Sequence, residues 1–199
     1  MRKVKVYGDP RRVLSLHSIV VQSPLLKDLL ADVLADYSGV TVGLHRLEFH
    51  GKFEPLIHRW PQLTAAIAKL KTDADEEGAE ELAVDRLEHA KLFYDLLKEE
   101  FQDNIDGSRD MIAKGVITYD LLWTAFQPRC FLYAKIQGHE RILRLQSSSY
   151  GKDHNENPCY WLTCEYVDYD GTNFGISRTM LNITAYEGMQ DPHAAGGSN

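Results

Sequence analysis

The sequence lacks any long apolar run, any phosphate-binding loop and any strong excess of positive charge. Its longest apolar stretches, such as Ile19-Val20-Val21 and Leu29-Leu30, fall far short of the roughly 20 residues that cross a bilayer. We therefore expect no membrane partner. The basic start, Met1 to Val6, is followed by no long apolar region, so we also expect no secretory signal.

Cysteine is scarce. The three residues are Cys130, Cys159 and Cys164, and an odd number in a chain of this size favours a reducing compartment over a disulfide framework. We expect an intracellular protein, cytoplasmic or nuclear. Cys159 and Cys164 are five apart on a predicted strand and so point to opposite faces, which argues against a shared zinc site. We expect no bound metal.

The motifs of common enzymes are also missing. The pairs Gly51-Lys52 and Gly151-Lys152 are followed by Phe53 and Asp153, where an ATPase needs Ser or Thr, and no apolar strand ends in Asp-Glu. Ser147-Ser148-Ser149 lacks the flanking glycines of a hydrolase elbow. We predict no catalytic residue and no cofactor. An enzyme whose thiol is activated by a histidine distant in sequence stays open as a third hypothesis, after the two binding roles given below.

The net charge is negative, and most of the excess of acidic residues lies in one segment. The net charge is −7, and residues 71–110 alone carry five Lys or Arg against fourteen Asp or Glu. Such a chain lacks the phosphate-neutralising surface that dominates affinity for nucleic acids. The composition therefore argues against a nucleic-acid partner.

Residues 1–126 carry mainly helical patterns, after one or two amino-terminal strands. Ser23-Pro24 predicts the start of a helix that extends to Asp36. A long amphipathic helix is expected at Leu82–Phe101, because six apolar residues alternate at spacings of four and three: Ala83, Leu87, Ala90, Tyr94, Leu97 and Phe101. Packing of this seam on its own domain is favoured over a dimer zipper. Residues 71–78 read as an acidic loop, and Ser108–Lys114 as a separate short helix.

Residues 127–187 carry strand patterns. Four strands are expected at Cys130–Gln137, Arg141–Gln146, Cys159–Tyr169 and Asn173–Thr184, with a hairpin turn at Asp170-Gly171. Short connections predict an antiparallel meander, which could curl into an SH3-like or half-open small barrel. The fold class is thus α+β. We expect residues 1–126 and 127–187 to form one compact unit, and 188–199 a disordered tail.

Two surfaces are candidates for partner binding. One is the acidic side of the long helix, with Glu80, Glu81, Glu88 and Glu99. The other is the aromatic part of the sheet, with Tyr166, Tyr169 and Phe174. Aromatic residues at this density more often form a core than bind a ligand, so a core role is favoured over ligand binding for this second set.

Several segments occur in the order seen in a known family. They are Ser23–Leu26, Phe53–Leu56, Leu82–Phe101, Ile117–Phe126 followed by Pro128, Leu132–Lys135 and Thr163–Gly171. Over residues 20–187 the chain resembles a domain of unknown function that precedes the AAA-type ATPase module in fungal proteins. In that family the chain continues into a linker and the ATPase, whereas here a Gly/Ser/Asn tail follows. The resemblance implies no catalytic residues.

The resemblance implies a non-catalytic accessory domain that acts by protein–protein recognition or regulation, with an ATPase module in cis or in trans. The alternative is a stand-alone module that binds a peptide or, less favoured, a nucleic acid.

Overall fold

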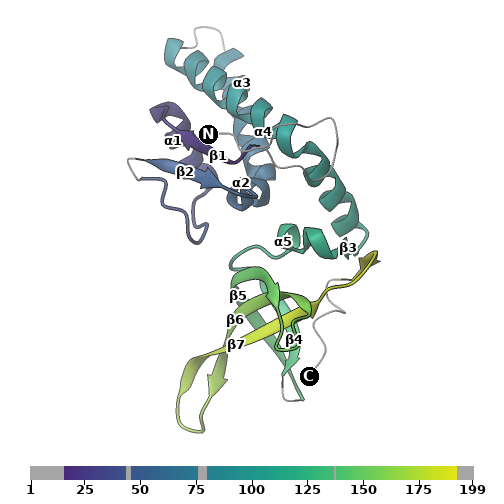
Figure 1. Cartoon of the computed structure of the whole chain (residues 1–199). Helices are drawn as coiled ribbons and strands as arrows, with labels where there is room; N and C mark the ends of the chain where they lie inside the picture. The colour runs from purple at the N-terminus through teal and green to yellow at the C-terminus, as the bar shows by residue number, and fades with distance from the viewer. Residues whose placement is uncertain (1–15, 44–45, 76–79, 137, 192–199) are drawn as a thin grey trace. The chain divides into compact units, whose positions relative to one another are not determined.

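The computed structural model describes residues 16–43, 46–75, 80–136 and 138–191 (Figure 1). Its contacts divide the chain into two compact units between Asp103 and Asn104. Helix α4 (Glu81–Ala113) contributes residues to both units. None of the described helices carries a stretch long and apolar enough to cross a membrane.

The first unit contains a strand pair and helices. Its elements are β1 (Ser18–Val21), α1 (Pro24–Val33), β2 (Leu47–His50), α2 (Glu54–His58), α3 (Trp60–Asp75) and the start of α4. Strands β1 and β2 pair antiparallel. Helix α1 begins where the sequence predicts: Ser23 Oγ accepts a hydrogen bond from the Leu26 N–H at 3.2 Å, and Pro24 takes the first helical position.

The apolar seam of α4 is used inside this unit. Leu97 is fully buried and Phe101 nearly so. Tyr94 stacks on Trp60 with ring centroids 4.6 Å apart, and Phe101 lies 5.1 Å from Phe53. Aromatic pairs at these separations add to the free energy gained by burial. The interpretation of the seam as a helix packed on its own domain is confirmed.

The second unit contains the main sheet. Its elements are the end of α4, β3 (Ile117–Thr118), the 3-10 turn η1 (Tyr119–Leu121), α5 (Leu122–Ala125), β4 (Phe131–Ile136), β5 (His139–Lys152), β6 (Pro158–Tyr169), β7 (Phe174–Thr184) and β8 (Met189–Gln190). Strands β4 to β7 form an antiparallel meander in chain order, as predicted. Within the described residues β4 and β7 do not pair with each other, so the sheet does not close into a barrel.

A bulge at Gln146 interrupts the pairing of β5 with β6, between Leu145 and Ser147. The extra residue shifts the alternation of β5 by one position, so even-numbered residues after the bulge face the side that odd-numbered residues face before it. Leu143 and Leu145 before it and Tyr150 after it therefore lie on one side of the sheet, which we call the core face. Tyr150 contacts Tyr160 of β6 there, with ring centroids 4.6 Å apart.

The helical segment before the sheet belongs with it. Tyr119 lies 5.4 Å from Tyr150, whose hydroxyl donates to the Tyr119 carbonyl at 2.8 Å. Phe126 lies 5.8 Å from Tyr160. These contacts place residues 119–126 with the sheet in the second unit, whereas we expected a change of character at 126/127 within a single unit.

Several local expectations differ from the structure. Helix α1 ends at Val33 and not at Asp36, and β5 extends to Lys152, past the expected end at Gln146. Residues 101–113 contain no break, because α4 continues through Gly107, with Ile105 and Ser108 buried. Helix α3 extends to Asp75 into the expected acidic loop, of which residues 76–78 lie outside the described residues. Met189 and Gln190, expected in a disordered tail, pair with β3, while residues 192–199 lie outside the described residues.

Candidate functional site: the exposed face of the sheet

The two faces of the β4–β7 sheet differ in burial. The core face carries buried residues from three strands: Leu143, Leu145, Tyr160, Leu162, Cys164 and Ile183. Alternation along each strand sends the neighbouring side chains to the opposite face. The register places Tyr133 beside Ile142, Val167 beside Ile176 and Tyr169 beside Phe174 on that opposite face.

This opposite face is apolar and exposed. Eight large apolar side chains lie on it, with Phe174 78 % exposed and Ile142 70 % exposed. They are Phe131, Tyr133, Ile142, Val167, Tyr169, Phe174, Ile176 and Met180, and we call them the apolar sheet face. Scattered exposed apolar residues are normal on proteins, whereas a contiguous set marks a binding surface.

One charged row crosses the apolar sheet face. Arg144 lies opposite Glu165, and Glu165 lies opposite Arg178. Arg144 donates from Nε to Glu165 Oε1 at 2.7 Å, and a second guanidinium nitrogen contacts the same oxygen. Glu165 is only 9 % exposed. One carboxylate thus lies between two guanidinium groups, which leaves the row with a net positive charge.

A second charged pair lies toward β4. Lys135 is opposite Glu140 in the register of β4 and β5. A hydrogen bond to Glu140 raises the pKa of Tyr133, because the carboxylate accepts from the neutral phenol. This pair is neutral overall, so the apolar sheet face keeps the single net positive charge of the Arg144–Glu165–Arg178 row.

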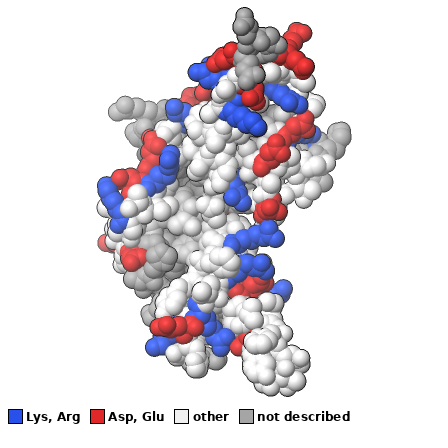
Figure 2. Space-filling view, turned by 180° about the vertical axis from the view of Figure 1, so that it is seen from behind, with Lys and Arg blue, Asp and Glu red and all other residues white. Residues whose placement is uncertain are grey.

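The β6–β7 hairpin holds the aromatic end of this face. The rings of Tyr169 and Phe174 lie 4.9 Å apart. Hydrogen bonds from the backbone N–H groups of Asn173 and Thr172 hold the pKa of Asp170 below its usual range. Gly171 has φ +99°, which confirms the predicted Asp-Gly turn. The hairpin end, at the bottom of the rear view, shows few charged atoms (Figure 2).

The structure separates Tyr166 from the other two predicted aromatic residues. Tyr166 lies on the core side of β6, where the Arg141 guanidinium carbon is 4.5 Å from its ring centroid. Arg141 also donates to Asp168 at 3.1 Å and holds the pKa of that carboxyl below its usual range. Arg141 therefore balances the charge of Asp168.

The predicted acidic residues of the helix belong to the first unit. Glu80, Glu81, Glu88 and Glu99 are all exposed. The spacing of the last three along α4 places them on one side of the helix. The aromatic residues lie in the second unit, so the two candidate surfaces are separate features of different units.

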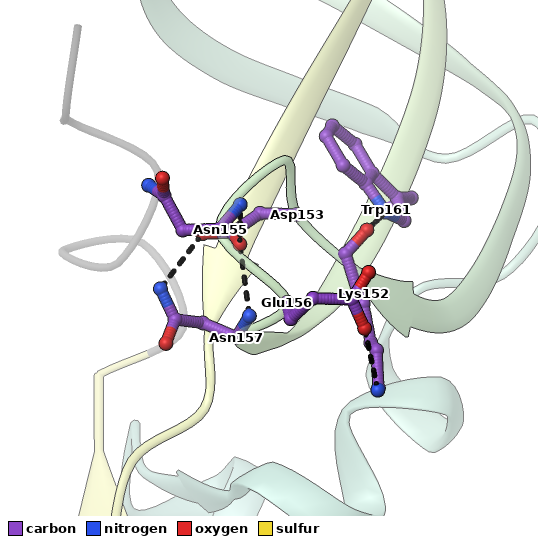
Figure 3. Close-up of polar contacts among 6 residues, drawn as sticks. All are labelled: Lys152, Asp153, Asn155, Glu156, Asn157 and Trp161. Atoms are coloured by element: carbon purple, nitrogen blue, oxygen red, sulfur yellow. Dashed lines mark hydrogen bonds and ion pairs between the residues drawn. The ribbon is translucent and has the colours of Figure 1, made fainter.

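The β5–β6 connection is a polar turn ordered by one carboxylate (Figure 3). Asp153 accepts hydrogen bonds from the backbone N–H groups of Asn155 and Asn157 at 2.8 and 2.9 Å, and these hold its pKa low. The Trp161 indole N–H donates to the Lys152 carbonyl, and its ring fills the space beside Gly151. Among the described residues, no three His, Cys, Asp or Glu side chains are grouped to bind a metal.

The cysteines do not have the electrostatics of a nucleophile. Burial raises the pKa of all three thiols, and that of Cys164 to about 11. A catalytic thiol needs the opposite shift, produced by a neighbouring cation or a helix N-terminus. The direction of these shifts disfavours the hypothesis of a thiol enzyme.

One polar pair was not found from the sequence. Ser23 Oγ lies 2.8 Å from His89 Nδ1, at the edge of a groove of about 450 Å³ in the first unit. The groove is lined mainly by apolar residues of β1, α1 and α4: Ile19, Val20, Val21, Leu26, Leu92, Phe93 and Leu96. The same Ser23 oxygen caps α1, so a structural role explains the contact. The position of His89 in the helical pattern does not predict this contact with Ser23.

Comparison with known proteins finds one family model that matches part of the chain. Residues 108–193 match a family model described as "Domain of unknown function (DUF7025)". The match spans somewhat less than half of the chain and includes the whole β4–β7 sheet. It begins after the amino-terminal segments at 20–101 that we included in the resemblance. No curated protein and no solved structure matches the chain. The second unit thus carries, at residues 108–193, a domain similar to this uncharacterised family.

Proposed function

We propose that the chain is a non-catalytic recognition domain whose apolar sheet face binds a segment of a protein partner. The observation that carries the proposal is the concentration of eight exposed apolar side chains on one side of the sheet. Burying a single Phe or Ile contributes about 1.5–3 kcal/mol. Covering part of this face therefore offers a large free-energy gain, even after the cost of association.

The charge on this face indicates the chemistry of the partner. The Arg144–Glu165–Arg178 row lies among apolar residues and has a net positive charge. A partner segment with apolar side chains and a carboxylate complements it. Nucleic acid fits less well, because a phosphate backbone requires many cations and this face has only three, each of them opposite a carboxylate.

The family resemblance supplies a setting for this recognition. In that setting the domain recruits a substrate to an AAA-type ATPase module, or regulates it, in cis or in trans. A stand-alone peptide-binding module would use the same surface. The three unpaired thiols agree with a reducing compartment, either the cytoplasm or the nucleus. The size of the native gene product on a blot distinguishes a module joined to an ATPase from a free-standing one.

Site-specific photocrosslinking in the cells of origin tests the proposal. A photoreactive phenylalanine analogue replaces Phe174 on the apolar sheet face or, as a control, Leu92, which is 75 % exposed on α4. We expect discrete crosslinked proteins from position 174 that disappear when Ile142→Asp is added. Identical products from both positions, or products insensitive to Ile142→Asp, would contradict the proposal.

A further inference from the structure

Strand β7 forms a long free edge of the sheet. It pairs with β6 on one side, and no other described strand pairs with it. The opposite edge, β4, has six residues, whereas β7 has eleven. Natural proteins usually protect such edges with Pro, several charges or a covering segment. The sequence of β7 contains no Pro and one charged residue, Arg178.

Two hydrogen bonds determine which backbone groups of β7 point outward. At one end of the β6–β7 pair, the Asp170 N–H donates to the Asn173 carbonyl at 3.2 Å. At the other end, the Ala185 N–H donates to the Pro158 carbonyl at 2.9 Å. Along antiparallel strands every second pair of opposite residues is hydrogen-bonded. Both bonds show that the odd-numbered residues of β7 form the hydrogen-bonded pairs with β6. The outward N–H and C=O groups therefore belong to alternate residues: Phe174, Ile176, Arg178, Met180, Asn182 and Thr184.

These residues also direct their side chains to the apolar sheet face. Phe174, Ile176 and Met180 are members of it, and Arg178 ends its charged row. A strand added at this edge would form ladder hydrogen bonds with these residues. On the exposed side of the sheet, its alternate side chains would lie beside theirs.

The charge of Arg178 indicates what kind of strand fits beside β7. Glu165, its cross-strand neighbour, is already bonded to Arg144, and among the described residues no ion pair of Arg178 is found. Arg178 lies near the middle of β7, so centred antiparallel pairing of two β7 strands would bring two arginines close together. A second copy of this chain is thus disfavoured, and a strand with a carboxylate is favoured.

We propose that an extended peptide of a partner protein adds to β7 as a fifth strand, with alternate apolar side chains and an Asp or Glu beside Arg178. This inference rests on the proposed function and specifies how the partner binds. The backbone ladder supplies affinity, while the apolar neighbours and Arg178 supply selectivity.

Selection from a phage-displayed library of random peptides, each as long as β7, tests this inference on the full chain. Ile176→Pro removes an outward N–H that β6 does not use, a position where edge strands tolerate proline. Ile176→Thr keeps the N–H and serves as its matched control. We expect the wild type to enrich peptides that alternate apolar residues and contain Asp or Glu. Their dissociation constants should rise about tenfold or more in Ile176→Pro, and clearly less in Ile176→Thr.

Arg178→Glu provides a second variant that leaves the backbone intact. It is expected to enrich Lys- or Arg-containing peptides in place of acidic ones. Peptides that bind Ile176→Pro as well as wild type, but lose binding with Val167→Ser, would overturn strand addition and leave recognition by the apolar sheet face standing. Absence of any enrichment would overturn the inference, while the crosslinking test judges the proposed function separately. A concentration-dependent dimer that Ile176→Pro abolishes would identify a second copy as the occupant and would also overturn it.

Discussion

At the scale of single residues, Glu165 is the carboxylate on which the charged row of the apolar sheet face depends. It is nearly buried and accepts from Arg144. Glu165→Gln leaves Arg144 and Arg178 without a balancing charge, so we expect the free energy of unfolding to fall by about 1.5–3 kcal/mol. Urea denaturation of the variant measures this change.

A double-mutant cycle gives the control for this prediction. Arg144→Met combined with Glu165→Leu removes both partners and leaves only the exposed Arg178 without a balancing charge, so its cost should be smaller than that of Glu165→Gln. If the double variant is as unstable as the sum of its single variants, the pair contributes no coupling and the prediction is wrong.

Two glycines test opposite backbone requirements. Gly107 lies inside α4, where an added Cβ would meet only the Met111 methyl at 3.9 Å. We expect Gly107→Ala to stabilise the chain by about 0.5–1 kcal/mol. Gly171, at φ +99° in the β6–β7 turn, is the control: Gly171→Ala should be destabilising there. Equal effects of the two substitutions on the thermal midpoint would contradict this assignment.

At the scale of elements, α4 provides a matched pair of leucines. Leu97 is fully buried in the seam, whereas Leu92 is 75 % exposed. Leu97→Ala should cost about 2–5 kcal/mol of stability because it leaves a cavity. Leu92→Ala should change it by no more than about 0.5 kcal/mol. A result in which both cost little would mean that the seam does not hold the first unit together; denaturant unfolding decides between these outcomes.

Most elements could be predicted from local patterns, and the errors have local causes. The seam of α4 and the four strands were predicted because apolar periodicity is strong in both. The break expected near 101–108 is absent, since burial of Ile105 and Ser108 compensates for the low helix propensity of Gly107. The short β3–β8 pair was missed, because two residues carry no periodic signal.

The candidate site was predicted only in part. Tyr169 and Phe174 were identified from the clustering of aromatic residues in the predicted sheet, and both lie on the apolar sheet face. Ile142 and Ile176 were missed because both sides of the strands carry apolar residues. Alternation alone does not indicate which side another element covers. The coverage is decided by η1 and α5, through contacts such as Tyr119 with Tyr150, which are distant in sequence.

At the scale of the whole molecule, acid sensitivity is expected to concentrate in the second unit. Asp153, Asp168 and Asp170 all have pKa values lowered in the folded state by hydrogen bonds. A carboxyl with a lowered folded pKa contributes stability above its unfolded pKa of about 3.9, and that contribution is lost as the pH falls through the folded pKa. We therefore expect backbone protection in β5–β7 to weaken progressively below about pH 4.

Hydrogen exchange read by mass spectrometry at successive pH values measures this loss segment by segment, after correction for the intrinsic exchange rate. Asp170→Asn keeps an acceptor in the turn and removes the charge. The variant should therefore be less protected than wild type near neutral pH and similar to it at about pH 2. A variant that differs from wild type by the same amount at every pH would contradict the electrostatic explanation.

The free edge of β7 also bears on how the chain behaves when it is concentrated. A long strand with apolar side chains and open backbone groups is a template for fibril growth. Arg178 is the only charge on that strand, and it occupies the position of a gatekeeper, a residue whose charge opposes stacking of identical strands. The same side chain that selects an acidic partner therefore also protects the unbound chain from aggregation.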